Sequence, residues 1–379
     1  LAMMVNAMSA LSSSFTILFL FWSITMLMRK FSEKNEGINL SKGSIIAILG
    51  SGAVGALTYT FTDSFWFSAV EGEVYAMSSL FTAAVFWAIL KWERVANEEH
   101  SNRWIVLIAY LIGLSIGVHL LNLLAIPAIA FVYYFKKHPY SHKGLVITGI
   151  MSMVVLGTVQ VLIIPKSIQV AAWFERIFTN SFGMPFNSGA IAFGILLIGL
   201  LVFAIRYTMS KGKVIWNTIV VSIMVIFIGY SSFAMIVIRS NANTPLDENN
   251  PETLAALLAY ANREQYGSWP IAYGPYFNSP TEGASDKNPT YMKAYIVEQN
   301  GKENSFHTEF NAKKFMSDNM IKDGEIQHKY ITIKDGKNVV PEYDSKYMTL
   351  FPRMFESDPA KVKGYKIWSG YDGTISTGN

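Results

Sequence analysis

The residues best suited to chemistry gather in one short stretch, DSFWFSAVEGEVY at residues 63–75, between two apolar runs that are each long enough to cross a bilayer. Asp63 opens it. Glu71 and Glu73 share no helix face, so they converge on one site only if the backbone at Gly72 is extended or looped. Such carboxylates can position an acceptor, bind a divalent cation or act as a general base. The alternative is a pair of solvated acids at a helix start, where negative charge is favoured.

Two further candidates are associated with later apolar runs. Arg239 follows the run that ends at Ile238, and its guanidinium suits a lipid-linked phosphate or diphosphate as well as it suits an interfacial anchor. His119 lies in GLSIGVHLLNLL, with Asn122 one helical turn on. A histidine at membrane depth is a functional candidate by default, and packing or capping is the alternative.

Polar residues are dense just beyond Arg239. Asn241, Asn243 and Asp247 carry hydrogen-bonding groups that suit sugar hydroxyls. Turn formation explains the same composition without a ligand, because Asn and Asp are common turn residues. The sequence leaves both readings open.

Glycine spacing in the second apolar run imitates a nucleotide motif. Gly50, Gly52 and Gly55 spell GxGxxG, but no strand precedes them and the surroundings are apolar, which argues against a dinucleotide site. Gly52 and Ala56, four apart, instead predict close helix packing. The 379 residues contain no cysteine, which excludes a disulfide, a thiolate nucleophile or a cysteine metal site within them.

Composition and hydropathy define the class of fold. Hydrophobic residues make up 51% of the chain and charged residues only 15%, below the roughly one quarter that is usual in soluble domains. Apolar runs of about 20 residues recur through the first 240 positions, which predicts an all-α polytopic membrane protein. The net charge of +4 is small, and the Lys and Arg residues cluster in short loops, so we expect no nucleic-acid partner. The predicted spans are 5–28, 44–61, 74–90, two within 104–135, 144–164, 190–207 and 214–238.

Basic residues set the predicted topology. They flank the long run 104–135 at both ends, which requires an even number of crossings and hence a turn outside, near Gly113 to His119. The same rule puts the acidic turn, the loop from Pro165 to Gly189 and everything after residue 238 outside. Five tryptophans fall near predicted span ends, as in an aromatic belt: Trp66, Trp92, Trp104, Trp173 and Trp216.

We expect three regions: a transmembrane domain at 1–239, an interfacial loop and amphipathic helix at 240–269, and a mixed extracytoplasmic region at 270–379. Asn250 is the expected cap of that helix, which would end at Gly267 and lie on the outer membrane surface. A hairpin is expected between residues 330–333 and 338–343, with its turn at Asp335 and Gly336.

Several separate stretches resemble the bacteroidete DUF2723 membrane proteins, a family similar to protein O-mannosyltransferases and grouped with the GT-C glycosyltransferases. The stretches are FWFSAVEGEVYAMSSLFTA (65–83), GLSIGVHLLNLL (113–124), IRSNANTPLDENNPE (238–252), REQYG (263–267) and LFPRM (350–354). The resemblance implies a GT-C-like helical bundle in a bacterial inner membrane, with its active face and C-terminal region periplasmic. It implies transfer of a sugar, mannose, from a polyprenyl-phosphate carrier to Ser or Thr hydroxyls of extracytoplasmic proteins.

In such a reaction a carboxylate deprotonates the acceptor hydroxyl and a cation stabilises the phosphate leaving group. The lipid-linked donor supplies the activation, so no nucleotide site is expected. A divalent metal could serve as the cation. The resemblance places the family's main acid in an extracytoplasmic loop before the segment that Leu1 begins. Glu71 and Glu73 would then be supporting residues. Members of the family are also expected to continue past residue 379.

Two other functions fit a polytopic protein with polar groups. A flippase for lipid-linked sugars needs polar residues near mid-membrane, often in symmetry-related halves, whereas the candidates here collect at one predicted face and no repeated half is visible. A non-catalytic scaffold whose tail binds a partner is the third possibility. An acidic loop upstream of Leu1 would discriminate between a scaffold and a transferase.

Overall fold

The computed structural model divides the chain into two compact units, each described by itself. The first comprises residues 1–166 with 194–238, and the second comprises 167–193 with 239–379. The described residues are 2–242, 244–245, 247–264, 272–275, 281–286, 290–321, 325–333, 339–352 and 359–370.

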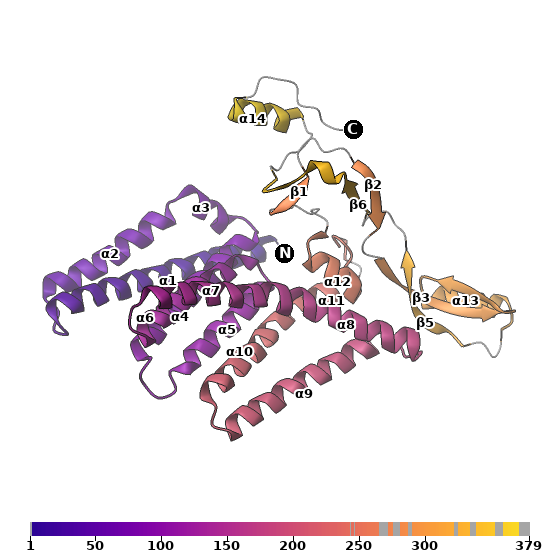
Figure 1. The fold of residues 1–379 in the computed structure, drawn as a ribbon, viewed down its shortest axis with the longest axis horizontal. Helices are drawn as coiled ribbons and strands as arrows, with labels where there is room; N and C mark the ends of the chain where they lie inside the picture. Colours follow the sequence, from indigo (N-terminus) through magenta and orange to yellow (C-terminus); the bar gives the residue numbers. More distant parts are fainter. Residues whose placement is uncertain are drawn as a thin grey trace. The chain divides into compact units, whose positions relative to one another are not determined.

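The first unit is a helical bundle, which confirms the predicted fold class (Figure 1). Among the described residues, seven helical stretches are long and apolar enough to cross a membrane, and α5 is a shorter apolar helix. The elements of the first unit are α1 (Ala2–Glu36), α2 (Lys42–Thr60), α3 (Asp63–Val70), α4 (Val74–Val95), α5 (Asn102–Ile116), the 3-10 helix η1 (Leu120–Leu124), α6 (Ala125–Lys137), α7 (His142–Gly157), the π-helical η2 (Thr158–Lys166), most of α9 (Ser188–Ser210), α10 (Val214–Tyr230) and η4 (Ser231–Phe233).

Helix boundaries follow local chemistry. The hydroxyls of Ser41 and Ser141 accept hydrogen bonds from backbone N–H groups in the first turns of α2 and α7, as N-caps do. The run 104–135 breaks between α5 and η1, at the end of the predicted turn near His119. The long apolar run therefore does form two segments.

Helix α4 is the core of the bundle and packs against α1, α5 and α6. Val85, Ala88 and Ile89 on it are fully buried. Trp92 is also fully buried and stacks on Tyr133 with ring centroids 5.0 Å apart. Its expected place in an aromatic belt is therefore wrong, because the ring faces neighbouring helices and not the surface.

Small residues let helices approach closely. A Cβ on Gly52 would lie 2.5 Å from Thr25 Cγ2 of α1, and Ala56 is buried, which confirms the packing role predicted for this spacing. A Cβ on Gly113 would clash with the backbone of Ile226 across the contact between α5 and α10. The backbones of α5 and α10 thus pack directly against each other.

The second unit begins with a helix where the sequence suggested a loop. Residues 165–189 include α8 (Ser167–Arg176) and the π-helical η3 (Ile177–Ser181). The helix is amphipathic, since Ile168, Ala171 and Glu175 are buried along one face. The expected loop is therefore largely helical, and two of its polar side chains, Glu175 and Thr179, are buried.

Where it is described, the C-terminal part of the second unit contains short helices and three small antiparallel sheets. The strand orders are β4–β3–β5, β1–β7 and β2–β6. The elements are α11 (Ala234–Ser240, which starts in the first unit), α12 (Leu254–Ala261), β1 (Tyr273–Pro275), β2 (Thr281–Asp286), β3 (Thr290–Gln299), β4 (Lys302–Phe306), α13 (Glu309–Asp318), β5 (Gln327–Ile333), β6 (Val339–Tyr343), η6 (Ser345–Tyr347), β7 (Met348–Leu350) and α14 (Pro359–Ser369).

The predicted hairpin is wrong in its pairing, although both strands exist. β5 pairs with β3, and β6 pairs with β2. The expected turn at Asp335 and Gly336 lies outside the described residues. Alternating strand patterns predict a strand but not its partner, which is chosen by long-range contacts.

The expected amphipathic helix is present as α12, with two differences. Its cap is Thr253, whose hydroxyl accepts from Ala256 N at 3.2 Å, and not Asn250. Its described end is Ala261, and Gly267 lies outside the described residues. Leu257 is buried where α12 packs against α8, so this apolar face is covered by protein.

Candidate functional site

The acidic turn joins α3 to α4. Glu71 ends α3 and Glu73 precedes α4, both with extended backbone, and both side chains are exposed. A Cβ on Gly72 would lie 3.0 Å from Val5 Cγ1 and 3.3 Å from Asn6 Oδ1 of α1. The turn therefore packs against the start of α1, and the helical geometry that would separate the two carboxylates is absent.

His119 lies at the same end of the bundle. Its Nδ1 accepts a hydrogen bond from Leu121 N at 3.2 Å, so the imidazole caps η1. The ring also contacts Tyr75 of α4, with centroids 5.7 Å apart. Since Tyr75 is two residues after Glu73, the fold brings the acidic turn and His119 together although 46 residues separate Glu73 from His119.

A buried polar pair supports this histidine. Asn122 is fully buried, and its Nδ2 donates to Ser115 Oγ at 3.0 Å. Its Oδ1 is buried without a partner among the described residues. The pair fixes η1 against the end of α5 and so holds His119 in place.

Asp63 is set apart from the two glutamates. It is exposed in the first turn of α3. At 1.5 Å rise per residue, α3 separates Asp63 from Glu71 by about 12 Å. If Asp63 and Glu71 bind the same substrate, they therefore contact parts of it that are well separated.

Arg239 and its neighbours belong to the second unit. Arg239 is exposed in the last turn of α11. Ser240 Oγ lies 2.9 Å from Asp247 Oδ2, and Asn241 Nδ2 donates to Glu252 O at 3.1 Å. These bonds fold the segment back on itself, the role expected of turn residues. Asn243 lies outside the described residues.

The second unit has a polar centre that sequence reasoning missed. Glu175 of α8 is 2% exposed. Its Oε1 accepts from Asn187 N at 2.5 Å and from Tyr330 Oη at 3.2 Å, and its Oε2 accepts from Ala190 N at 3.0 Å. One carboxylate thus ties α8 to the start of α9 and to β5.

Tyr330 completes this centre. Burial, followed by the neighbouring Glu175 carboxylate, raises the pKa of its phenol, so the group stays a hydrogen-bond donor at neutral pH. Its backbone N–H donates to Asn180 Oδ1 at 2.8 Å, and Asn180 Nδ2 donates back to Tyr330 O at 3.0 Å. The sheet strand is thereby fixed to η3.

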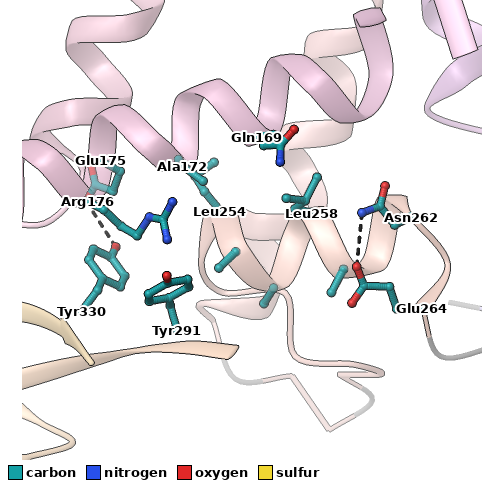
Figure 2. A pocket seen from close by; sticks show the side chains of 13 residues that line it. Gln169, Ala172, Glu175, Arg176, Leu254, Leu258, Asn262, Glu264, Tyr291 and Tyr330 are labelled. Carbon is teal, nitrogen blue, oxygen red and sulfur yellow. Dashed lines mark hydrogen bonds between the residues drawn. The ribbon is translucent and has the colours of Figure 1, made fainter. Parts of the chain in front are cut away.

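A pocket of about 280 Å³ lies beside this centre, lined by α8, α12, β3 and β5 (Figure 2). The guanidinium of Arg176 lies over the ring of Tyr291, 4.2 Å from its centroid. Asn262 Nδ2 donates to Glu264 Oε1 at 3.2 Å in the same lining. Leu254 and Leu258 supply an apolar wall.

Residue type gave only a faint signal for Glu175. A charged pair, Glu175 and Arg176, interrupts an otherwise apolar stretch, which marks an unusual position. Its partners are distant in sequence or are backbone amides, so no spacing rule reveals them. No group of three or more potential His, Cys, Asp or Glu metal ligands occurs in the described part of the chain.

The fold and composition define a polytopic helical membrane protein. Residues 1–142 match the family model described as the protein O-mannosyl-transferase TMEM260 N-terminal domain, which supports the resemblance to protein O-mannosyltransferases. Residues 267–378 match a family of unknown function, DUF8416. No curated protein and no solved structure matches the chain. The first match includes the acidic turn and His119.

Proposed function

We propose that this chain is a membrane glycosyltransferase of the GT-C type. It would transfer mannose from a polyprenyl-phosphate carrier to Ser or Thr hydroxyls of proteins outside a bacterial inner membrane. The observation that carries the proposal is the match of residues 1–142 to the protein O-mannosyl-transferase model. That region contains Glu71, Glu73 and His119, which lie at one end of the bundle.

The proposed reaction needs few groups. The acceptor oxygen attacks the anomeric carbon, the bond from that carbon to the phosphate oxygen breaks, and the hydroxyl proton passes to a carboxylate. A cation stabilises the negative charge that develops on the phosphate. We assign Glu71 and Glu73 to support of the acceptor and Arg239 to the phosphate.

The polar groups at the acidic end fit these roles. Glu71 and Glu73 are exposed and available to an acceptor, and His119 is held by Leu121 N and Tyr75. By the positive-inside rule this end faces the extracytoplasmic side. A lipid-linked donor would reach it from the bilayer and a protein acceptor from the aqueous side.

The test is sugar transfer by the intact, purified protein in detergent. Polyprenyl-phosphate mannose and a Ser/Thr peptide are supplied, and the peptide is read by intact mass. We expect one added hexose. Since a positioned acid or base contributes about 10² to 10⁴-fold, Glu71→Gln should reduce the rate by at least about tenfold if it supports the acceptor.

The matched control is Glu98→Gln, which removes an exposed carboxylate from the turn that follows the opposite end of α4. It should leave the rate unchanged. Absence of transfer with several donors by folded protein would refute the transferase proposal. Transfer that survives both Glu71→Gln and Arg239→Ala would refute the assignment of the site alone.

A further inference from the structure

The basic end of the bundle, opposite the acidic turn, contains two adjoining hollows. The first, of about 250 Å³, lies among α1, α4 and α6. The second, of about 590 Å³, lies between α1 and α2 and also reaches α4. Both are lined by Met26, Arg29 and Arg94, so they meet at these residues.

The first hollow is positively charged. Its lining holds four cations and two carboxylates. Glu33 pairs with Arg29 at 2.6 Å, and Glu93 pairs with Lys30. Arg94 and the half-buried Lys136 make no salt bridge with any side chain that the structure describes. Two positive charges are therefore left for an anion from outside the chain.

The walls on the membrane side are apolar. Leu27 and Leu90 line the first hollow, and Ile45, Ile48 and Leu49 of α2 line the second. Along α1, α2 and α4, these residues lie deeper in the predicted spans than the charged residues that end them. The two hollows therefore combine one charged opening, which we call the charged mouth, with two separate apolar walls.

We propose that this pair of hollows binds the phosphate headgroup of an anionic glycerophospholipid, with an acyl chain against each apolar wall. Arg94 and Lys136 would contact the phosphate, since a guanidinium and an ammonium are the usual phosphate ligands. Basic pockets between membrane helices on the cytoplasmic side are typical sites for such headgroups. The 21 residues from Glu73 to Arg94 span about 32 Å, so this site is remote from the proposed reaction.

The experiment is native mass spectrometry of the intact, purified protein in detergent, titrated with phosphatidylglycerol. Phosphatidylcholine with the same acyl chains, polyprenyl phosphate and inorganic phosphate are titrated in parallel. We expect one phosphatidylglycerol to bind most tightly. Arg94→Gln combined with Lys136→Gln should weaken this binding by about thirtyfold, because each basic group contributes about 1 kcal/mol to the attraction of an anionic lipid and every interval of about 1.4 kcal/mol corresponds to a tenfold change in affinity.

The matched control combines Arg206→Gln with Lys211→Gln, which removes two exposed charges from the end of α9 and its loop. It should retain the bound lipid. A separate variant, Ile45→Trp, should obstruct the apolar wall and weaken phosphatidylglycerol while leaving inorganic phosphate unaffected.

Three results would overturn the proposal. If the two double variants lost phosphatidylglycerol affinity equally, the lipid would be attracted by basic residues in general and not by this site. If phosphatidylcholine bound as tightly as phosphatidylglycerol, the net negative charge of the lipid would play no part in its binding. Tighter binding of polyprenyl phosphate or of inorganic phosphate would assign the charged mouth to a different ligand.

Discussion

At the scale of single residues, the best-defined polar group is Glu175. Its two oxygens are satisfied by backbone N–H groups and by Tyr330 Oη. Gly189 makes this possible, since a Cβ there would clash with the backbone at Glu175 and Phe174. We therefore interpret Glu175 as a structural clamp, because each of its two carboxylate oxygens accepts a hydrogen bond from a backbone N–H group that the fold holds in place.

Glu175→Gln tests this clamp. The amide keeps the shape of the carboxylate, but its NH₂ must face one of the two backbone N–H donors, Asn187 N or Ala190 N. An unsatisfied buried donor costs about 1–3 kcal/mol. We expect a lower midpoint of thermal unfolding, measured by tryptophan fluorescence of the intact protein in detergent, and faster proteolysis of the second unit.

Glu309→Gln is the control, because this exposed carboxylate forms a surface ion pair with Lys313 one turn on. The Lys313 side chain lowers the pKa of Glu309, but an exposed pair contributes little. Equal thermal stability of Glu175→Gln and the wild type would refute the clamp.

At the scale of elements, contacts between helix backbones organise the bundle. Gly113 of α5 faces Ile226 of α10, and Gly229 of α10 faces the backbone of Tyr110 and Leu114 in return. Close approach of this kind replaces side-chain interdigitation and depends on the missing Cβ. The contact also positions η1, and with it His119, because η1 follows the end of α5.

Gly113→Ala should therefore destabilise the bundle. Its Cβ meets backbone atoms that cannot rotate away, and overpacking costs about 1–3 kcal/mol. The midpoint of thermal unfolding should fall. Gly194→Ala in α9 is the matched control, since its Cβ would meet nothing within 4 Å. A Gly113→Ala protein as stable as the control would show that the two helices separate easily.

At the scale of the whole molecule, the basic residues predict which face lies inside. Contacts at the basic end join elements that are far apart in sequence. Lys137 Nζ donates to Ala96 O at 2.6 Å, and Asn102 Nδ2 donates to Thr218 Oγ1 at 3.3 Å. These contacts gather three of the loops that the positive-inside rule assigns to the cytoplasm.

Single-cysteine labelling measures this topology directly. The 379 residues contain no cysteine, so an introduced thiol within them reacts without background. An impermeant maleimide added to intact spheroplasts should label Glu71→Cys and spare Glu99→Cys. Inverted vesicles should give the opposite pattern. Labelling of both positions from one side would refute the predicted arrangement of the spans.

The sequence alone determined the class of protein and much of its secondary structure. Apolar runs predicted the helical spans, because a bilayer imposes a minimum length on each crossing. The split of the run 104–135 followed from its flanking charges. The role of Gly52 followed from its spacing with Ala56. These features are local, so they can be read from neighbouring residues.

Tertiary structure decided what depends on distant partners. It placed His119 beside Tyr75, paired β5 with β3 in place of the expected hairpin, and turned the expected loop at 165–189 into α8. It also buried Glu175 among donors up to 155 residues away. A buried carboxylate is stable only when fixed donors surround it, and only the folded chain brings those donors together.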